Sequence, residues 1–196
     1  IWDLCSGLGG WTKAFELEHT LGIVQVYRFE NNPLLRGVPF THMQDVKEWK
    51  KWAFNYPQPD VIVASPPCLE FSNAYNAPKV RAKREGIEFE PDLEILHACK
   101  EIIDTIKPKW WIIENVAGAS KTFSEELGMK PRQIIGPMFL WGYFPYLAVS
   151  DVKMDKSKNF DVGDPLRANK RAVIPFEVSV ALADAVFHQK TLGDFQ

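Results

Sequence analysis

The sequence predicts an α/β fold, in which a doubly wound and mostly parallel sheet is covered by helices on both faces. Three observations lead to this prediction. Short apolar runs alternate with amphipathic stretches along the chain, as expected when strands and helices alternate. Asp60–Ala64 (DVIVA) is a continuous apolar run, which is typical of a strand inside a parallel sheet. A glycine-rich turn, Ser6–Gly10, joins the first apolar run to the stretch that follows it.

The first half of the chain contains three predicted strands. Ile1–Cys5 is a short buried strand that leads directly into the glycine-rich turn, and Trp11–Thr20 is the helix after it. Leu21–Glu30 (LGIVQVYRFE) is rich in strand-forming residues and ends in an acid, which favours a second strand. Val46–Phe54 is expected to form a short helix before the Asp60–Ala64 strand.

The second half begins with the clearest helical pattern in the chain. Apolar residues of Asp92–Ile106 recur at spacings of three and four, which makes one apolar stripe, and Pro108 ends this helix. Trp110–Glu114 (WWIIE) is the next buried strand. Pro131–Val149 is expected to form strands and turns. Pro175–Gln189 is expected to form a final helix with its proline in the first turn.

Two polar segments interrupt this order. Asn73–Pro91 is expected to be a loop, which is either a solvated surface segment or a mobile segment that closes on a polyanion. It contains four cations within six residues, Lys79, Arg81, Lys83 and Arg84. Lys153–Arg171 shows no periodicity and is expected to be an exposed connection.

The composition is that of an ordinary globular protein and excludes several classes. Hydrophobic residues make up 46% and charged residues 24% of the 196 residues, and the formal net charge is −2. Three cysteines outside C-x-x-C pairs exclude a disulfide scaffold, argue against a zinc site and favour a reducing compartment. No apolar run reaches the ~18 residues of a membrane span. We therefore expect a single cytoplasmic domain over residues 1–196, with no membrane contact and no metal.

Asp3–Gly10 (DLCSGLGG) is a candidate cofactor turn. In doubly wound folds, a turn between a strand and a helix lies where nucleotides bind, and its glycines let the backbone approach a ligand. Its spacing matches neither G-x-G-x-x-G nor G-x-x-x-x-G-K-[ST], which disfavours NAD and ATP. Glu30 is placed to accept hydrogen bonds from ribose hydroxyls, and Asp45 to bind an adenine amino group. These features fit S-adenosylmethionine, although a structural turn and two ordinary surface acids explain them as well.

Ser65–Cys68 (SPPC) and Glu114 are candidate catalytic features. Two successive prolines make a stiff turn after the DVIVA strand, and this turn presents Cys68 at the sheet edge. A thiol is nucleophilic even when only a small fraction is thiolate. Glu114 ends a neighbouring strand, so we expect it to converge with Cys68, and apolar neighbours raise the pKa of such a carboxyl group so that it can donate a proton. The alternatives are a small core residue and a surface acid.

Taken together, these motifs resemble those of the cytosine-C5 DNA methyltransferase family. The D-L-F-x-G-x-G-G-F motif of the family is matched by Asp3–Trp11, and its P-P-C-x-x-F-S motif by Pro66–Ser72. Glu114–Val116 matches E-N-V, and Ile174–Phe176 matches the motif of the last helix. Gly136–Pro145 is similar to compact phage-type members. The resemblance implies a Rossmann-like methyltransferase fold.

The resemblance also implies S-adenosylmethionine as methyl donor, S-adenosylhomocysteine as product and C5 of cytosine in DNA as acceptor. It implies that Cys68 attacks C6 of a flipped-out base and forms a covalent adduct, while Glu114 holds or protonates N3. The residues expected to bind the cofactor are Cys5, Ser6, Gly7, Leu8, Gly9, Gly10, Glu30, Asn31, Asp45, Val46 and Pro67. The residues expected to bind the substrate are Ser72, Asn115, Lys79, Arg81, Lys83, Arg84 and Arg171.

The chain departs from the family where members carry a target-recognition domain. Residues 150–171 leave room only for a short connection, so we expect no such domain and consider a separate specificity subunit. Either Arg132–Gln133 or Arg171 is expected to support the flipped base. Three alternatives remain: methylation of an exocyclic amino group, the same chemistry on tRNA cytosine, and a cofactor-binding or DNA-binding subunit without activity. The resemblance places the protein in the cytoplasm of a prokaryote or of a phage-infected host cell.

Overall fold

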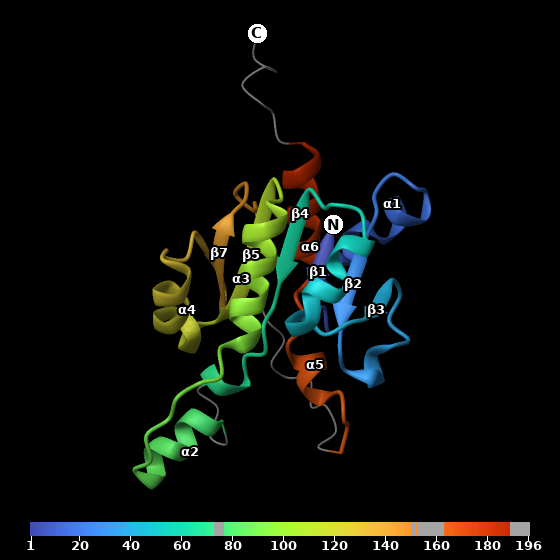
Figure 1. The fold of residues 1–196 in the computed structure, drawn as a ribbon. Coiled ribbons are helices and arrows are strands. Elements are labelled where there is room, and N and C mark those ends of the chain that lie inside the picture. The colour runs from blue at the N-terminus through green and yellow to red at the C-terminus, as the bar shows by residue number, and fades with distance from the viewer. Residues whose placement is uncertain (73–76, 150–151, 153–162, 189–196) are drawn as a thin grey trace.

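A seven-stranded sheet runs through the described part of the chain, which in this computed structural model comprises residues 1–72, 77–149, 152 and 163–188. The strand order is β3-β2-β1-β4-β5-β7-β6 (Figure 1). The strands are β1 (Trp2–Leu4), β2 (Tyr27–Glu30), β3 (Thr41–Met43), β4 (Val61–Ala64), β5 (Trp110–Val116), β6 (Gln133–Ile135) and β7 (Met138–Tyr143).

The first five strands are parallel, and the last two are antiparallel to their neighbours. β1 pairs in parallel with both β2 and β4, β4 pairs in parallel with β5, and β7 pairs antiparallel with β5 and β6. The chain builds outward from β1 to β3 and then returns to place β4 on the other side of β1. This reversal forms a topological switch point, the position at which doubly wound folds bind their ligands.

Helices cover both faces of the sheet, which confirms the predicted doubly wound class. On one face, α3 (Glu94–Ile106), α4 (Ser120–Leu127) and the 3₁₀ helix η3 (Val46–Lys51) bury residues such as Ile102, Phe123 and Trp49. On the other face, the 3₁₀ helix η1 (Gly10–Phe15) packs on α6 (Phe176–Phe187). The remaining helices are α1 (Glu16–Thr20), η2 (Pro33–Leu35), η4 (Ala53–Asn55), η5 (Leu69–Phe71), α2 (Pro78–Glu85), η6 (Ala117–Ala119) and α5 (Arg167–Arg171).

Most predicted strands and the long helix are confirmed, but several boundaries were wrong, among them that of the predicted Trp11–Thr20 helix, which is a 3₁₀ segment up to Phe15 followed by the short α1. Only the last four residues of the predicted Leu21–Glu30 strand are extended, because Gly22 adopts a φ of 74° and turns the chain. The predicted Val46–Phe54 helix is two 3₁₀ segments separated at Trp52. β5 continues two residues past Glu114, where it pairs with β7.

Both polar segments contain helices instead of continuous loops. The predicted loop Asn73–Pro91 contains α2, which has Pro78 in its first turn and ends at Gly86 with a φ of 67°. Residues 73–76 of that prediction lie outside the described residues. The predicted connection ends in α5, while 150–151 and 153–162 are also outside the description.

The final helix agrees with its prediction apart from its ends. It begins at Phe176, so Pro175 is its N-cap residue and not part of its first turn. Gln189, the last residue of the predicted helix, lies beyond the described chain.

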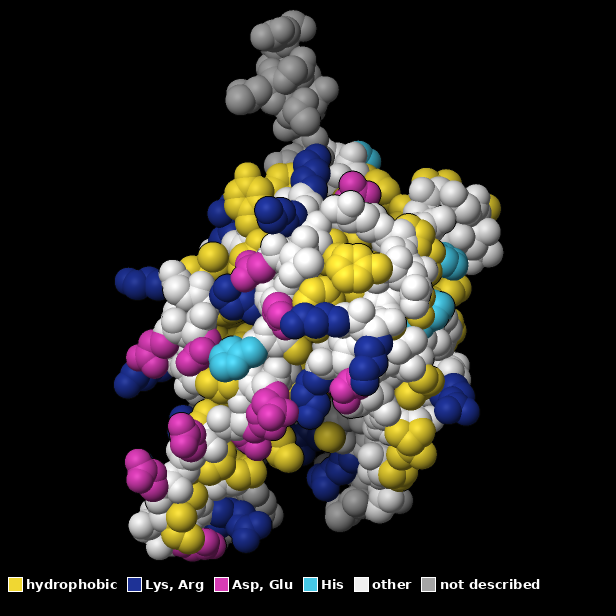
Figure 2. Space-filling model, in the orientation of Figure 1, with side chains coloured by type: hydrophobic (Ala, Val, Ile, Leu, Met, Phe, Trp, Pro, Cys, Tyr) yellow, Lys and Arg dark blue, Asp and Glu magenta, His cyan; other side chains and the backbone are white. Residues whose placement is uncertain are grey.

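The carboxyl ends of the parallel strands point toward the end of the molecule that carries α2 and α5 (Figure 1). The space-filling view shows a notch between the projection formed by α2 and the one formed by α5, with Lys and Arg side chains near it (Figure 2). None of the helices in the described ranges is long and apolar enough to cross a membrane.

Candidate active site

The loop after β1 has a backbone that few residues tolerate. Cys5, Gly7 and Gly9 adopt φ values of 55°, 54° and 73°, in the left-handed region that favours glycine. A Cβ at Gly9 would lie 2.3 Å from Cζ of Arg28, so a larger residue cannot occupy this position without displacing that side chain. The glycine-rich turn is therefore fixed by close packing as well as by its dihedral angles.

Arg28 on β2 is a buried cation that the sequence reasoning missed. Its guanidinium is fully buried and donates hydrogen bonds to the Gly9 carbonyl (3.1 Å), the Thr12 hydroxyl (2.8 Å) and the Glu16 carboxylate (3.1 Å). Paired in this way, the charge does not carry the full cost of desolvation. Arg28 thus ties the loop after β1 to η1 and α1.

Glu30 and Asp45 are joined to the same region. The Glu30 carboxylate accepts hydrogen bonds from the backbone nitrogens of Gly7 (2.9 Å), Asn31 (3.0 Å) and Asn32 (2.9 Å). The Asn31 amide donates to Asp45 at 3.3 Å. The structure therefore brings the predicted cofactor residues after β1, β2 and β3 to one edge of the sheet.

Two buried polar atoms beside this loop have no hydrogen-bond partner among the described residues. They are the Ser6 hydroxyl oxygen and Oδ1 of Asp3. Burial raises the pKa of Asp3 to about 7, although Arg28 and a hydrogen bond from Thr12 oppose this shift. Because unpaired buried polar atoms are costly, this part of the loop suits a polar ligand.

Other predicted cofactor residues surround the loop. Gly10 packs against Ile174, and a Cβ at Gly7 would lie 3.8 Å from Nδ2 of Asn169 on α5. Val46 is buried, Leu8 is half-buried and Pro67 is exposed. Asn169 was missed because its segment showed no periodicity.

Cys5 turns toward a second sulfur. A hydrogen bond with Cys99 on α3, together with burial, raises the pKa of the Cys5 thiol well above its ordinary value. Cys99 itself is fully buried in the core under α3. We therefore assign Cys5 to the packing of the loop more than to reactivity.

The turn after β4 carries Cys68 as predicted. Pro66 is buried, and Cys68 is the partly exposed N-cap residue of η5. Nδ2 of Asn115 on β5 donates to the Pro66 carbonyl at 2.9 Å, and Oδ1 of Asn115 accepts from the Val116 backbone. The side chain of Asn115, predicted to bind substrate, is thus buried and holds the turn that presents Cys68.

Cys68 and Glu114 converge at the carboxyl edge of β4 and β5. Burial and then the negative charge of Glu114 raise the pKa of the Cys68 thiol. Burial raises the pKa of Glu114 to about 7, while a hydrogen bond from Ser65 lowers it. β4 pairs with β5 only as far as Ala64 opposite Ile113, so Glu114 lies just past the last β4 pair. A thiol and a carboxyl group that can hold a proton near neutral pH therefore share one site.

The predicted phosphate-binding residues lie on the two projections beside this site. Lys79, Arg81 and Lys83 are exposed on α2, with Arg84 in its last turn. Arg171 is exposed in the last turn of α5, next to Lys170. Ser72, also predicted to bind substrate, is half-buried one residue after η5. Of the two candidates to support a flipped base, Arg132 packs its guanidinium over the Phe144 ring, 5.6 Å from its centroid.

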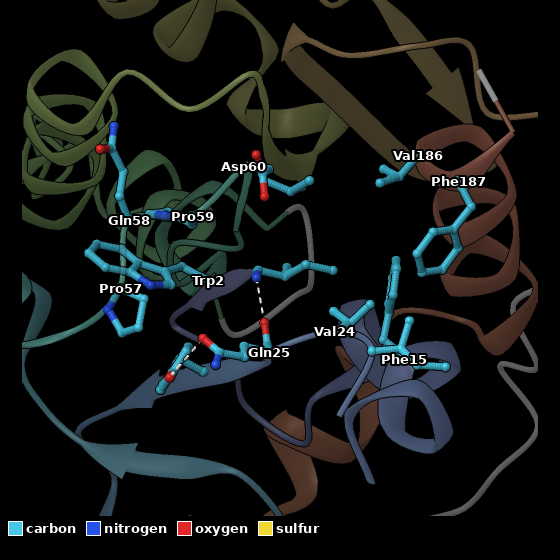
Figure 3. Close-up of a pocket in the computed structure, with 14 residues that line it drawn as sticks. Trp2, Phe15, Val24, Gln25, Pro57, Gln58, Pro59, Asp60, Val186 and Phe187 are labelled. Atoms are coloured by element: carbon cyan, nitrogen blue, oxygen red, sulfur yellow. Dashed lines mark hydrogen bonds between the residues drawn. The ribbon is translucent and has the colours of Figure 1, made fainter. Parts of the chain in front are cut away.

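One hollow lies at the opposite end of the sheet and is lined by none of the predicted site residues (Figure 3). Phe15, Val24 and Phe187 form its apolar wall, while Asp60 and Gln58 border it on the other side. A second, smaller hollow lies beside the prolines of the Cys68 turn and is lined by Pro66, Pro67 and others. The described residues contain no group of His, Cys, Asp or Glu that could hold a metal ion.

Comparison with known proteins gives matches over most of the chain. The family model of C-5 cytosine-specific DNA methylases matches residues 1–154. The chain is similar to type II methyltransferase M.HindV of Haemophilus influenzae, with 28% identity over 130 residues, and to type II methyltransferase M.MspI of Moraxella sp, with 32% identity over 119 residues. These matches cover 61% and 59% of this chain but 38% and 26% of the two relatives. The chain therefore spans well under half the length of the relatives it matches.

Proposed function

This chain belongs to the C-5 cytosine-specific DNA methylase family, and on that premise we propose that it transfers a methyl group from S-adenosylmethionine to C5 of cytosine in DNA. The observation that carries this proposal is the convergence of Cys68 with Glu114 beside the glycine-rich loop. A thiol on a stiff two-proline turn, next to a carboxyl group of raised pKa, is typical of a reactive site.

The residues around the loop after β1 fit the cofactor. Glu30 keeps acceptor capacity for ribose hydroxyls in addition to its three backbone hydrogen bonds. The unpartnered Ser6 hydroxyl and Asp3 Oδ1 offer further polar contacts to a ligand. When bound, S-adenosylmethionine supplies an electrophilic methyl group on a sulfonium. The chain's own task is to orient that group and to make the acceptor carbon nucleophilic.

Cys68 activates the base by adding to it. C5 of cytosine is a poor nucleophile, so the Cys68 thiolate first forms a bond to C6, and the displaced electron pair moves into the ring. Glu114 donates its proton to N3 and keeps the ring neutral. C5 is then electron-rich and accepts the methyl group. Loss of the C5 proton to a base, loss of the Cys68 thiolate from C6 and return of the N3 proton to the Glu114 carboxylate then restore the aromatic ring and the acid form of Glu114.

The proposed reaction requires Cys68 as the thiolate and Glu114 as the protonated acid. An ionised Glu114 raises the pKa of Cys68 and opposes thiolate formation, whereas a protonated Glu114 exerts no such effect. The acid form of Glu114 is also the form that can protonate N3. Because the pKa of Glu114 is raised to about 7, a substantial fraction is protonated near neutral pH.

The two projections beside the site suit a nucleic acid backbone. The helices α2 and α5, which carry these basic residues, lie at the end of the molecule toward which the carboxyl ends of the parallel strands point, so their cations can neutralise phosphates on either side of the target (Figure 1). The base itself must leave the stack before Cys68 can reach C6, at a cost of a few kcal/mol. Phosphate contacts offset part of that cost.

The test is to identify the methylated nucleoside. The chain is incubated with labelled S-adenosylmethionine and unmethylated duplex DNA, and the digested nucleosides are separated by mass spectrometry. The proposal predicts 5-methylcytosine in DNA and none with Cys68→Ser. N4-methylcytosine or N6-methyladenine overturns it in favour of amino-group chemistry, and label confined to a parallel tRNA reaction overturns the choice of DNA. Cys99→Ala is the control for the loss of a thiol, since Cys99 is fully buried and cannot reach a nucleobase.

A further inference from the structure

Trp11 and Ser65 form a hydrogen-bonded pair next to Glu114. Nε1 of Trp11 donates to Oγ of Ser65 at 3.0 Å, and the Trp11 side chain is 2% exposed. The backbones of both residues are held in place: the Ser179 hydroxyl on α6 donates to the Trp11 carbonyl at 2.7 Å, and the Ser65 nitrogen donates to the Leu4 carbonyl at 3.2 Å. These contacts therefore hold the Trp11–Ser65 pair in a fixed position.

The strand arrangement places Ser65 beside Glu114 on one face of the sheet. Side chains alternate between faces along a strand, so Ser65 shares a face with Val63, and Glu114 shares a face with Ile112. Val63 and Ile112 both belong to the core under η1 and α6, which is also where Trp11 packs. Trp11, Ser65 and Glu114 thus follow three adjacent strands, β1, β4 and β5, on the same side.

The donor and acceptor groups of Trp11, Ser65 and Glu114 determine which of them donates each hydrogen bond. An indole N–H is only a donor, so Trp11 occupies a lone pair of the Ser65 hydroxyl oxygen and leaves its hydrogen for another acceptor. That acceptor is the Glu114 carboxyl group, to which Ser65 is hydrogen-bonded. The Glu114 oxygen that faces Ser65 therefore accepts a hydrogen bond. An oxygen that accepts a hydrogen bond is the carbonyl-type oxygen of a protonated carboxyl group, so this arrangement favours the Glu114 proton on the other oxygen.

We propose that Trp11 and Ser65 are positioning residues that fix which oxygen of Glu114 carries the proton delivered to the base. This inference rests on the proposed function, because it concerns the proton given to N3. It assigns a role to a serine and a tryptophan that the proposed chemistry does not itself use. Without the pair, the carboxyl group can present either its proton or its lone pair to the ring.

The other groups around Glu114 do not replace this control. Cys68 follows β4 and responds to the charge of Glu114. On β7, the residue paired with Glu114 is Leu140, which is apolar and fully buried. Among the described residues, burial and the Ser65 hydrogen bond are the two causes that set the pKa of Glu114.

The first test measures the pKa of Glu114 in the free chain by infrared difference spectroscopy, with Glu114→Gln to identify its carboxyl band. Ser65→Ala is expected to raise the pKa of Glu114 by roughly half to one unit, since it loses one hydrogen bond to the ionised form. Trp11→Phe, which keeps the ring but removes the N–H, is expected to raise it less. Ser65→Thr keeps the hydroxyl and should leave it unchanged. An unchanged pKa in Ser65→Ala overturns the proposal.

The second test measures methylation of DNA against pH. Ser65→Ala and Trp11→Phe are expected to lower kcat about tenfold with KM for DNA unchanged, and to move the alkaline limb of the profile to higher pH. A role in packing alone predicts lower activity with no change in that limb, and this result also overturns the proposal.

The chain offers a matched control for both tests. Nε1 of Trp141 donates to Oγ of Ser124 at 3.1 Å on the opposite face of the sheet. Trp141→Phe and Ser124→Ala remove the same kind of hydrogen bond and should change neither the pKa of Glu114 nor the limb. If the wild-type chain methylates nothing, the proposed function fails, while the infrared measurement still decides whether the pair controls Glu114.

Discussion

Cys68 and Glu114 lie close together at the carboxyl edge of the sheet. Burial is the largest effect that raises the pKa of the Cys68 thiol, and the negative charge of Glu114 raises it further. The two groups that the proposed reaction needs therefore oppose each other when both are ionised. Binding of a base at N3 removes this opposition, because it keeps Glu114 protonated. A bound base therefore favours thiolate formation beyond the extent that Glu114, already partly protonated near neutral pH, allows in the free chain.

Glu114→Gln should make Cys68 more reactive toward a small alkylating agent while it strongly reduces methylation. Removal of the carboxylate charge lowers the pKa of Cys68, so more thiolate exists at any pH below that pKa. We expect severalfold faster modification of Cys68 by iodoacetamide, followed by peptide mass spectrometry, and a loss of methylation on the order of 10²–10⁴-fold. Slower alkylation in the variant would show that Glu114 does not act on Cys68 through its charge.

The stability of the fold should depend on the protonation of Glu114. Its pKa is raised from 4.5 to about 7 in the folded chain, so the folded state holds the proton more tightly than the unfolded chain. The resulting stability is fully present below pH 4.5 and is lost as the pH rises through about 7. Glu114→Gln cannot ionise, so its Tm should fall less than that of the wild type between about pH 5 and pH 8.5. Equal falls in calorimetry would contradict the raised pKa.

Gly9→Ala should destabilise the chain more than the same change at Gly128. Both glycines have positive φ, 73° and 66°, so each variant loses about 1–2 kcal/mol from the backbone alone. A Cβ at Gly128 meets open space, but one at Gly9 meets the buried Arg28 guanidinium, which adds a further ~1–3 kcal/mol. Denaturant unfolding of both variants compares the two costs directly. Equal losses would mean that Arg28 moves aside freely.

The lysines of α2 should contribute to DNA affinity through charge. Lys79 and Lys83 are four residues apart, so they lie on one face of α2, and both are exposed. Lys79→Gln with Lys83→Gln should weaken DNA binding and reduce the slope of log K against log salt by about 1–2. Lys107→Gln with Lys109→Gln, at the amino end of β5, removes the same charge far from the site and should leave the slope unchanged. Equal slopes in the two double variants would exclude α2 from the interface.

The sequence predicted the strands and the site motifs well because burial on both sides leaves an unmistakable apolar run. Val61–Ala64 and Trp110–Ile113 are such runs, and the structure pairs them in parallel. Cys68 and Glu114 converge as expected because parallel neighbours end at the same edge. The motif residues could be identified from the sequence without any knowledge of side-chain packing.

Features that depend on packing could not be predicted. Thr41–Met43 is a short edge strand whose three residues are all partly exposed, so it carries no apolar pattern. α2 has no buried residue and was interpreted as a loop for that reason. The links of Arg28 to Gly9 and of Trp11 to Ser65 join residues 19 and 54 positions apart, and nothing in local spacing signals them.

The most direct test of the proposed chemistry is a covalent trap. The chain is mixed with S-adenosylmethionine and a DNA duplex that contains 5-fluorocytosine, whose fluorine cannot be eliminated from C5. We predict an adduct that survives a denaturing gel and maps by peptide mass spectrometry to the Cys68 sulfur, and that is absent from Cys68→Ser. Methyl transfer to DNA with no adduct, or an adduct located on Cys5 or Cys99, would contradict the assignment of Cys68 as the nucleophile.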